Sequence, residues 1–266
     1  MIATELVDHI LSFLHSDEDM YTTLKACSLA FPQIADRHLY SHITFYAPDP
    51  ADHIPMSWHQ AFYAKRTNSK GTYVVDPTEF SHLLVDRPHI ANCVRVLRII
   101  AGTGLGSPTT ALLPVISSNM SNLSQIESIT FSSRRLLSWP ALDPIFCTAL
   151  QNSIRLPSIK QAAVSEINGF PLETFHSKNL RSLLLYNLCI AGVDAPTSSY
   201  PRLHSLRVDN GPNLSGIVPW MRNDTLHTLS LCIYELDGLS GFWPLIDACS
   251  ASLVSLELDH KFCGAL

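Results

Sequence analysis

The chain has 266 residues, of which 46% are hydrophobic and only 15% are charged, and its formal net charge is -5. This length allows a sizeable core or a long repeat array, whereas the low charge and the lack of a basic stripe disfavour nucleic-acid binding through phosphate neutralisation. No run approaches the roughly 20 apolar residues that cross a bilayer, and Glu5 and Asp8 stand where a secretory signal carries basic residues. We therefore expect a soluble cytoplasmic or nuclear protein with no membrane partner.

Seven cysteines are scattered along the chain, and no two of them form a C-x-x-C pair. An odd number at such spacings favours neither a disulfide framework nor a zinc site. We expect most of them to behave as small hydrophobic core residues.

The first forty residues predict three short helices. Apolar residues at 6, 7, 10, 11, 13 and 14 make a wide stripe on a helix over residues 5–14. Ser16 or Asp17 can cap a second helix, and Pro32 ends it and can open a third. Three helices this short bury too little surface to be stable alone, so we expect them to pack on a partner or on a neighbouring domain.

The same segment, residues 1–45, resembles an F-box. The family pattern begins L-P-x-E-L and continues with an apolar helix, an acidic turn and a helix ending near C-S-L; this chain has I-A-T-E-L at 2–6, D-E-D at 17–19 and L-K-A-C-S-L at 24–29. F-box proteins dock on the adaptor Skp1 and, through it, on a cullin. The resemblance implies that an apolar helical patch binds Skp1 here. Its candidate residues are Ile2, Leu6, Val7, Ile10, Leu14 and Leu24.

Two departures from the family pattern touch the surface with which its members bind Skp1. The usual second-position proline is Ala3, and the stretch after C-S-L is shortened to residues 30–32. They keep an alternative open, in which the F-box is degenerate and the protein binds a partner without any ligase role.

Residues 46–90 are expected to form a linker and the helical N-terminal cap of a repeat array. The stretches 38–43 and 80–99 resemble the form found before the repeats of fungal F-box proteins.

The pattern L-x-x-L-x-L, with apolar substitutes, recurs over residues 91–266. The last two apolar residues of a copy point to one face of a strand, and each unit buries that face only against its neighbours. Asp143 and Pro144 predict a capped returning helix between two copies. Seven copies begin at Val94, Ile126, Ile159, Leu180, Leu203, Leu226 and Leu253.

These copies resemble leucine-rich repeats, although the usual Asn or Cys at the ninth position is missing. The fold class that we expect is therefore α/β: a three-helix F-box followed by an irregular leucine-rich-repeat solenoid with a curved parallel sheet. The residue at the third position is small and polar in most copies, and these residues would line up from strand to strand in such an array. Its members are Ser128, Ser182, Ser205, Thr228 and Ser255.

Together the resemblances imply the substrate-recognition subunit of a Skp1-cullin-F-box ubiquitin ligase, an adaptor without catalytic residues that holds an unknown protein substrate on its repeats. The fifth and seventh positions of each repeat point to the face that would hold the substrate. Arg, Tyr and paired charges suit an interface. The candidate substrate-binding residues are Arg98, Tyr186, Arg207, Asp209, Glu257 and Asp259.

A third and more distant interpretation is an α/β enzyme. Gly102, Gly104 and Gly106 follow a predicted strand and precede a predicted helix, as in a dinucleotide-binding turn. The spacing is G-x-G-x-G rather than G-x-G-x-x-G, and no acidic residue ends a second strand at the usual distance. His38 and His42 lack the glutamate that follows the first histidine of a zinc protease. We expect no cofactor and no metal.

Overall fold

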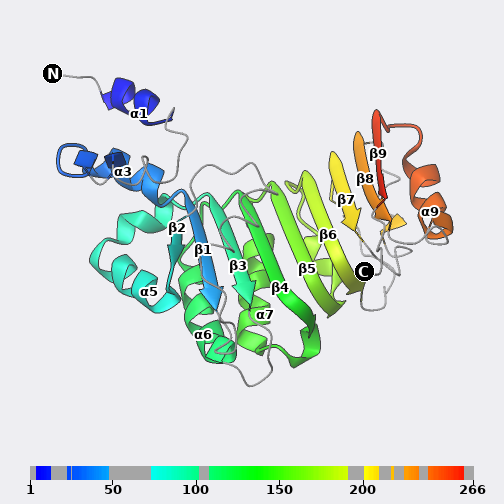
Figure 1. Cartoon of the computed structure of the whole chain (residues 1–266), viewed down its shortest axis with the longest axis horizontal. Helices are drawn as coiled ribbons and strands as arrows, with labels where there is room; N and C mark the ends of the chain where they lie inside the picture. Colours follow the sequence, from blue (N-terminus) through cyan, green and yellow to red (C-terminus); the bar gives the residue numbers. More distant parts are fainter. Residues whose placement is uncertain are drawn as a thin grey trace, which may run out of the picture. The chain divides into compact units, whose positions relative to one another are not determined.

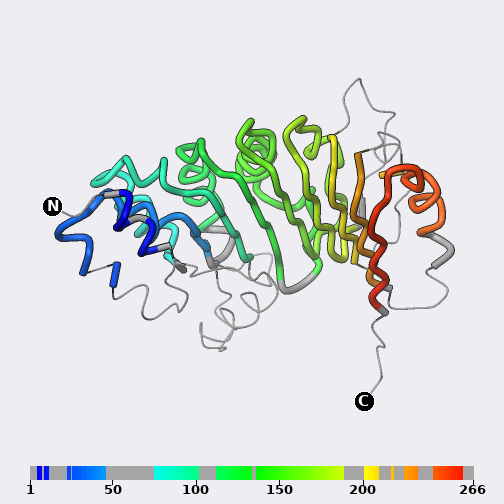
Figure 2. Tube along the Cα trace, turned by 90° about the horizontal axis from the view of Figure 1, so that it is seen from above, coloured from blue at the N-terminus to red at the C-terminus, as the bar shows by residue number. Residues whose placement is uncertain are grey.

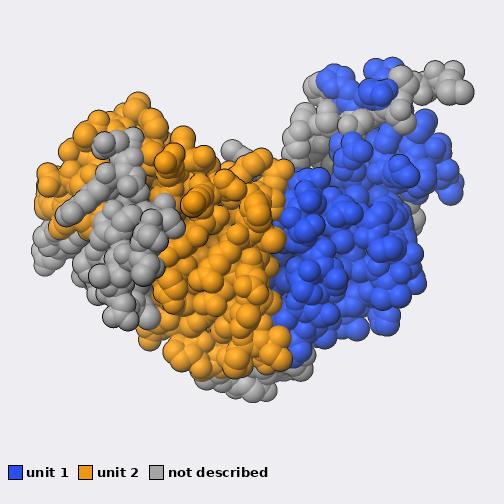
Figure 3. All heavy atoms as spheres, turned by 180° about the vertical axis from the view of Figure 1, so that it is seen from behind, with its two compact units in different colours: residues 1–126 blue, residues 127–266 orange. Residues whose placement is uncertain are grey.

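The computed structural model describes residues 4–12, 23–24, 26–47, 73–101, 108–190, 201–209, 217–218, 225–233 and 239–260. The chain divides into two compact units, residues 1–126 and residues 127–266, which Figure 3 colours separately. Both units are of the α/β type with parallel strands, which confirms the coarse fold prediction. None of the described helices is long and apolar enough to cross a membrane.

The first unit contains three parallel strands in the order β2-β1-β3. Their bounds are His42–Ala47 for β1, Tyr73–Val75 for β2 and Val96–Ala101 for β3. Ile43 and Phe45 of β1 lie opposite Leu97 and Ile99 of β3, and all four side chains are fully buried. Because side chains alternate along a strand, this column of apolar residues forms one face of the sheet and the core beneath it.

The first unit also contains helical segments. They are α1 (Thr4–Ser12), α3 (Pro32–Leu39), α5 (Pro77–Asp86), the 3-10 helix η1 (Pro88–Asn92) and α6 (Pro108–Ser121). The carboxylate of Asp76 caps α5 by accepting hydrogen bonds from the backbone N–H groups of Thr78 and Glu79 at 2.7 and 3.2 Å. Phe80 of α5 then packs edge-on against Phe45 with the ring centroids 5.4 Å apart.

The second unit contains six parallel strands, each paired with the next one in the chain (Figure 1). Figure 2 shows these strands side by side in chain order. The strands are β4 (Ser128–Ser138), β5 (Gln161–Phe170), β6 (Ser182–Ile190), β7 (Ser205–Asp209), β8 (Thr228–Ile233) and β9 (Ser255–His260).

The repeated apolar pattern is aligned in register across these strands. The fourth-position residues pair from strand to strand and, up to β8, are at most 3% exposed. Burying a leucine in this way contributes about 1.5–3 kcal/mol. In β9, the last strand of this order, the equivalent leucines 256 and 258 are 42% and 54% exposed. The paired column consists of Ile129, Ala162, Leu183, Leu206, Leu229 and Leu256.

The described connections of the second unit include helical segments. They contain η2 (Trp139–Ala141), α7 (Pro144–Ile154), η3 (Leu172–Phe175) and α9 (Leu239–Cys249). The predicted cap of α7 is confirmed, because the carboxylate of Asp143 accepts hydrogen bonds from the N–H groups of Ile145 and Phe146 at 2.7 and 3.0 Å. Phe146 meets Phe131 of β4 at 5.2 Å between ring centroids, which fixes α7 on this side of the strands.

Candidate functional site

The N-terminal helices separate the predicted Skp1-binding residues into two groups. Val7 and Leu24 are 8% and 0% exposed and belong to the small core that these helices share. Leu6 and Ile10 lie one turn apart on α1 and are 51% and 54% exposed. Burial therefore assigns Val7 and Leu24 to packing between helices and leaves Leu6 and Ile10 as the accessible apolar pair. The remaining two predicted residues lie outside the described residues: Ile2 and Leu14.

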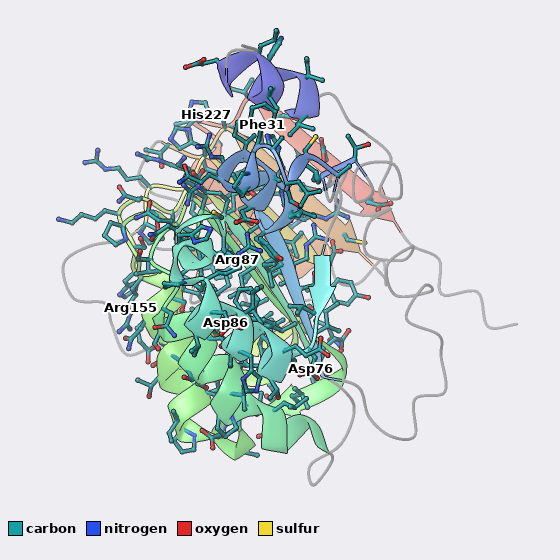
Figure 4. The ribbon with its side chains drawn as sticks, turned by 90° about the vertical axis from the view of Figure 1, so that its left-hand side faces the viewer. Phe31, Asp76, Asp86, Arg87, Arg155 and His227 are labelled. Atoms are coloured by element: carbon teal, nitrogen blue, oxygen red, sulfur yellow. The ribbon has the colours of Figure 1, made fainter. Side chains whose placement is uncertain are left out.

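A buried carboxylate ties these helices to the rest of the first unit. Asp36 of α3 is 1% exposed, and its Oδ2 accepts hydrogen bonds from the guanidinium of Arg87 and from Nε2 of His89, the latter at 2.8 Å. Figure 4 labels Arg87, which directly precedes η1. A buried charge is tolerated only when it is paired in this way. The pair thus holds α3 against the start of η1.

The face of the second unit opposite the apolar column carries most of the predicted substrate-binding residues; we call it the polar face. Figure 1 shows the strands of this unit in front of α7, so the polar face is the side of the strands that faces the viewer. One row across β6 to β9 is Leu184, Arg207, Ser230 and Glu257. The next row, across β4 to β9, is Ser132, Ser165, Tyr186, Asp209, Cys232 and Asp259.

Five of the six predicted residues therefore share one face over four consecutive strands. Tyr186 and Asp209 are direct neighbours across the β6–β7 pair. On β7, Nε of Arg207 lies 3.5 Å from Oδ1 of Asp209, and the side chains are 41% and 5% exposed. Glu257 and Asp259 of β9 are exposed. The accessible groups of this face are thus a tyrosine, one guanidinium and the carboxylates of Glu257 and Asp259, whereas Asp209 is buried beside Arg207. This set suits a polar peptide with basic groups.

Arg98, the sixth predicted residue, belongs to the first unit. It lies opposite Thr44 in the pairing of β3 with β1 and is only 8% exposed. Burial lowers the pKa of its guanidinium below the usual value. A side chain with so little surface has little to offer a partner, so its burial assigns Arg98 to the interior of the first unit.

A pair of left-handed residues interrupts the neighbouring strands β5 and β6. Glu166 and Asn187 have φ values of 60° and 44° and lie side by side between the strand pairs at 165/186 and 167/188. Nδ2 of Asn187 donates a hydrogen bond to Oε2 of Glu166 at 2.7 Å. Positive φ is uncommon outside glycine and is favoured at functional or structurally determined positions.

This pair resets the alternation of both strands. In a regular strand, residues 165 and 167 would face the same side. Here Ser165 belongs to the polar face, whereas Ile167 is fully buried, and the same holds for Tyr186 and Leu188, which is 3% exposed. The pair therefore ends the polar face beside Tyr186. The sequence analysis did not predict this pair. Asparagine is enriched at positive φ but glutamate is not, so the residue types alone do not indicate two adjacent left-handed positions.

The first unit also contains a pocket of about 460 Å³ between α5 and α6. Asn119 lies at its wall, accepting a hydrogen bond from the hydroxyl of Ser81 and donating one to the carbonyl of Pro77, both at 2.7 Å. The other residues that line it are apolar or uncharged: Leu84, Val85, Pro88, Ala91, Asn92, Ser118 and Asn122. The lining thus contains no carboxylate, imidazole, thiol or amine that could act as an acid or a base.

Three of the described cysteines have raised thiol pKa values. Burial raises the pKa of the Cys147 thiol to about 11, and it also raises the pKa values of Cys93 and Cys249. A thiol with a raised pKa stays protonated at neutral pH, whereas the thiolate is the reactive form. Within the described ranges, no group of three His, Cys, Asp or Glu side chains is placed to hold a metal ion. The glycine turn at residues 102–106 lies outside those ranges.

Comparison of the chain with models of known protein families gives no match, and a search of curated proteins gives none either.

Proposed function

We propose that this protein is the substrate-recognition subunit of a Skp1-cullin-F-box type ubiquitin ligase, with an F-box at its N-terminus and an irregular leucine-rich-repeat array behind it. The observation that carries the proposal is the register of the second unit, which aligns five predicted substrate-binding residues from the strands β6, β7 and β9 on one polar face. A protein that only receives a partner needs such a face and needs no catalytic group.

The exposed pair on α1 supports the ligase part of the proposal. Leu6 and Ile10 are more than half exposed, while Val7 and Leu11 on the other side of α1 anchor the helix in its core. A helix whose apolar stripe is wider than its buried side can pack on its own domain and still present exposed apolar residues to an adaptor. Skp1 is the partner that the resemblance implies for this surface.

A second candidate function is a repeat protein that binds its partner without a ligase role. The burial of Val7 and Leu24 favours it, because only two of the four described adaptor-binding candidates remain accessible. Ala3 stands where the F-box pattern has proline.

A co-precipitation of purified Skp1 with the full chain separates the two candidates. We expect the chain to retain Skp1, and Leu6→Asp and Ile10→Asp to reduce retention at least about tenfold, since each places a charge in an apolar contact. Val85→Asp is the matched control, because Val85 is an apolar residue of α5 in the same unit and is 80% exposed. Circular dichroism confirms that each variant is folded. Failure of the unaltered chain to retain Skp1 would favour the repeat protein without a ligase role.

A further inference from the structure

Four basic residues form a ladder at the beginning of the strands of the second unit. Lys160, Arg181, His204 and His227 each directly precede a strand, from β5 to β8. The backbone N–H of each of the last three donates to the carbonyl of the one before it, at 2.8, 2.7 and 2.9 Å. Neighbouring strands are about 4.8 Å apart, so the four side chains span about 14 Å. We call them the basic ladder.

The side chains of the basic ladder are exposed and form a row. Nη1 of Arg181 lies 3.4 Å from Nε2 of His204, whose ring stacks on that of His227 with 5.3 Å between centroids. Lys160 pairs with Glu127 at 2.7 Å, where the ladder starts. Figure 4 labels His227.

The basic ladder corrects the expectation that the chain has no basic stripe. Its members are 21 to 23 residues apart in the sequence, and only the parallel register brings them together. Packing does not require a basic residue at this position, because Val254 occupies it before β9 and donates its N–H to the carbonyl of His227 at 2.9 Å. A guanidinium only donates hydrogen bonds, so Nε2 of His204 accepts from Arg181, and the permanently charged members of the ladder are Lys160 and Arg181.

We propose that the basic ladder binds an acidic segment of a polypeptide, extended across the starts of the strands. An extended chain advances about 3.3 Å per residue, so four to five residues match the length of the ladder. The guanidinium of Arg181 can hold a carboxylate through two parallel hydrogen bonds. Val254 is 80% exposed at the far end of the ladder and offers a contact for an apolar residue next to the acids. This surface does not depend on Skp1 binding.

A nucleic acid fits the basic ladder less well than an acidic peptide. Proteins that bind single strands without sequence preference add aromatic side chains on which the bases stack. The segments that carry the ladder, residues 157–161, 178–182, 201–205 and 225–228, contain no Phe, Tyr or Trp. The net charge of -5 repels a long polyanion, and the ladder is too short to neutralise many phosphates.

Fluorescence anisotropy with the full chain tests this proposal. The probe is a labelled peptide of five glutamates followed by leucine, and the control peptide replaces the glutamates by glutamine. We expect the acidic peptide to bind at least about tenfold more tightly than the control, and 200 mM salt to weaken it, because exposed charges are screened. We expect Arg181→Glu to weaken binding about tenfold. Arg37→Glu, at an exposed basic residue of α3 that belongs to neither the basic ladder nor the polar face, should leave it unchanged.

Two results would overturn the proposal once circular dichroism shows that the variants are folded. The first is that the unaltered chain does not bind the acidic peptide, or that the Arg181→Glu variant binds it with the same affinity as the unaltered chain. The second is a thymidine oligonucleotide of equal charge that binds more tightly than the peptide and is lost in the Arg181→Glu variant, which would make the ladder a nucleic-acid site.

Discussion

At the residue scale, Asp36 shows how one buried carboxylate can organise the contact between two helical segments. Its Oδ2 receives hydrogen bonds from Arg87 and His89, while Oδ1 is buried and has no hydrogen-bond partner among the described residues. Removing one member of such a site lowers the free energy of unfolding, because its buried partners are then left without a hydrogen bond or an opposite charge.

We predict that Asp36→Ala lowers the free energy of unfolding of the protein by about 2 kcal/mol, since it leaves two donors without their acceptor. Arg87 is 37% exposed and recovers part of its hydration, which keeps the loss below that of a fully buried pair. Urea denaturation measures the change. Glu79→Ala, an exposed acid of the nearby α5, is the control and should change stability by less than about 0.5 kcal/mol; an equal effect of the two substitutions would contradict this role of Asp36.

The left-handed pair is the second residue-scale feature with a measurable cost. We predict that Asn187→Gly changes stability by less than about 1 kcal/mol, because the lost hydrogen bond is offset by relief of the strain at φ 44°. Asn187→Val should cost about 2 kcal/mol or more, since a β-branched residue is strained at positive φ. Thermal unfolding of both variants compares them, and a valine variant as stable as the glycine variant would show that the strand is not left-handed here.

At the element scale, helix starts were the most predictable features of this chain. Asp143 followed by Pro144 carries a local signal for a cap and a first turn, and α7 begins there. The strand pairing could also be predicted, because the apolar pattern recurs at nearly constant spacing between residues 180 and 231. The left-handed pair in β5 and β6 could not, because it depends on cross-strand contacts that the pattern of a single strand does not carry.

We predict that Asp143→Ala destabilises the protein by about 1 kcal/mol, the usual cost of losing an N-cap with two accepted N–H groups. Chemical denaturation measures this, with Asp247→Ala as the control, because Asp247 is an exposed acid inside α9 and caps no helix start. The cap has no such role if the two variants are equally stable.

At the scale of the whole molecule, the candidate site was only partly predictable. The repeat positions correctly placed Tyr186, Arg207 and Asp209 together, because period-two alternation in register determines a face. Burial could not be predicted in the same way: Arg98, Asp209 and Leu24 occupy the expected kind of position but are covered by their surroundings. The basic ladder was missed because its residues become neighbours only through pairing over more than 20 residues.

The proposed function requires that the chain hold an adaptor and a protein substrate at the same time. A photo-crosslinking residue at position 186, on the polar face, can report the substrate, and one at position 145, an exposed site of α7, is the matched control. After irradiation in cells, complexes are purified through Skp1 and the crosslinked proteins are identified. We predict adducts from position 186 and none from position 145 in the Skp1-bound fraction; equal adducts from both positions, or none that purify with Skp1, would contradict the account.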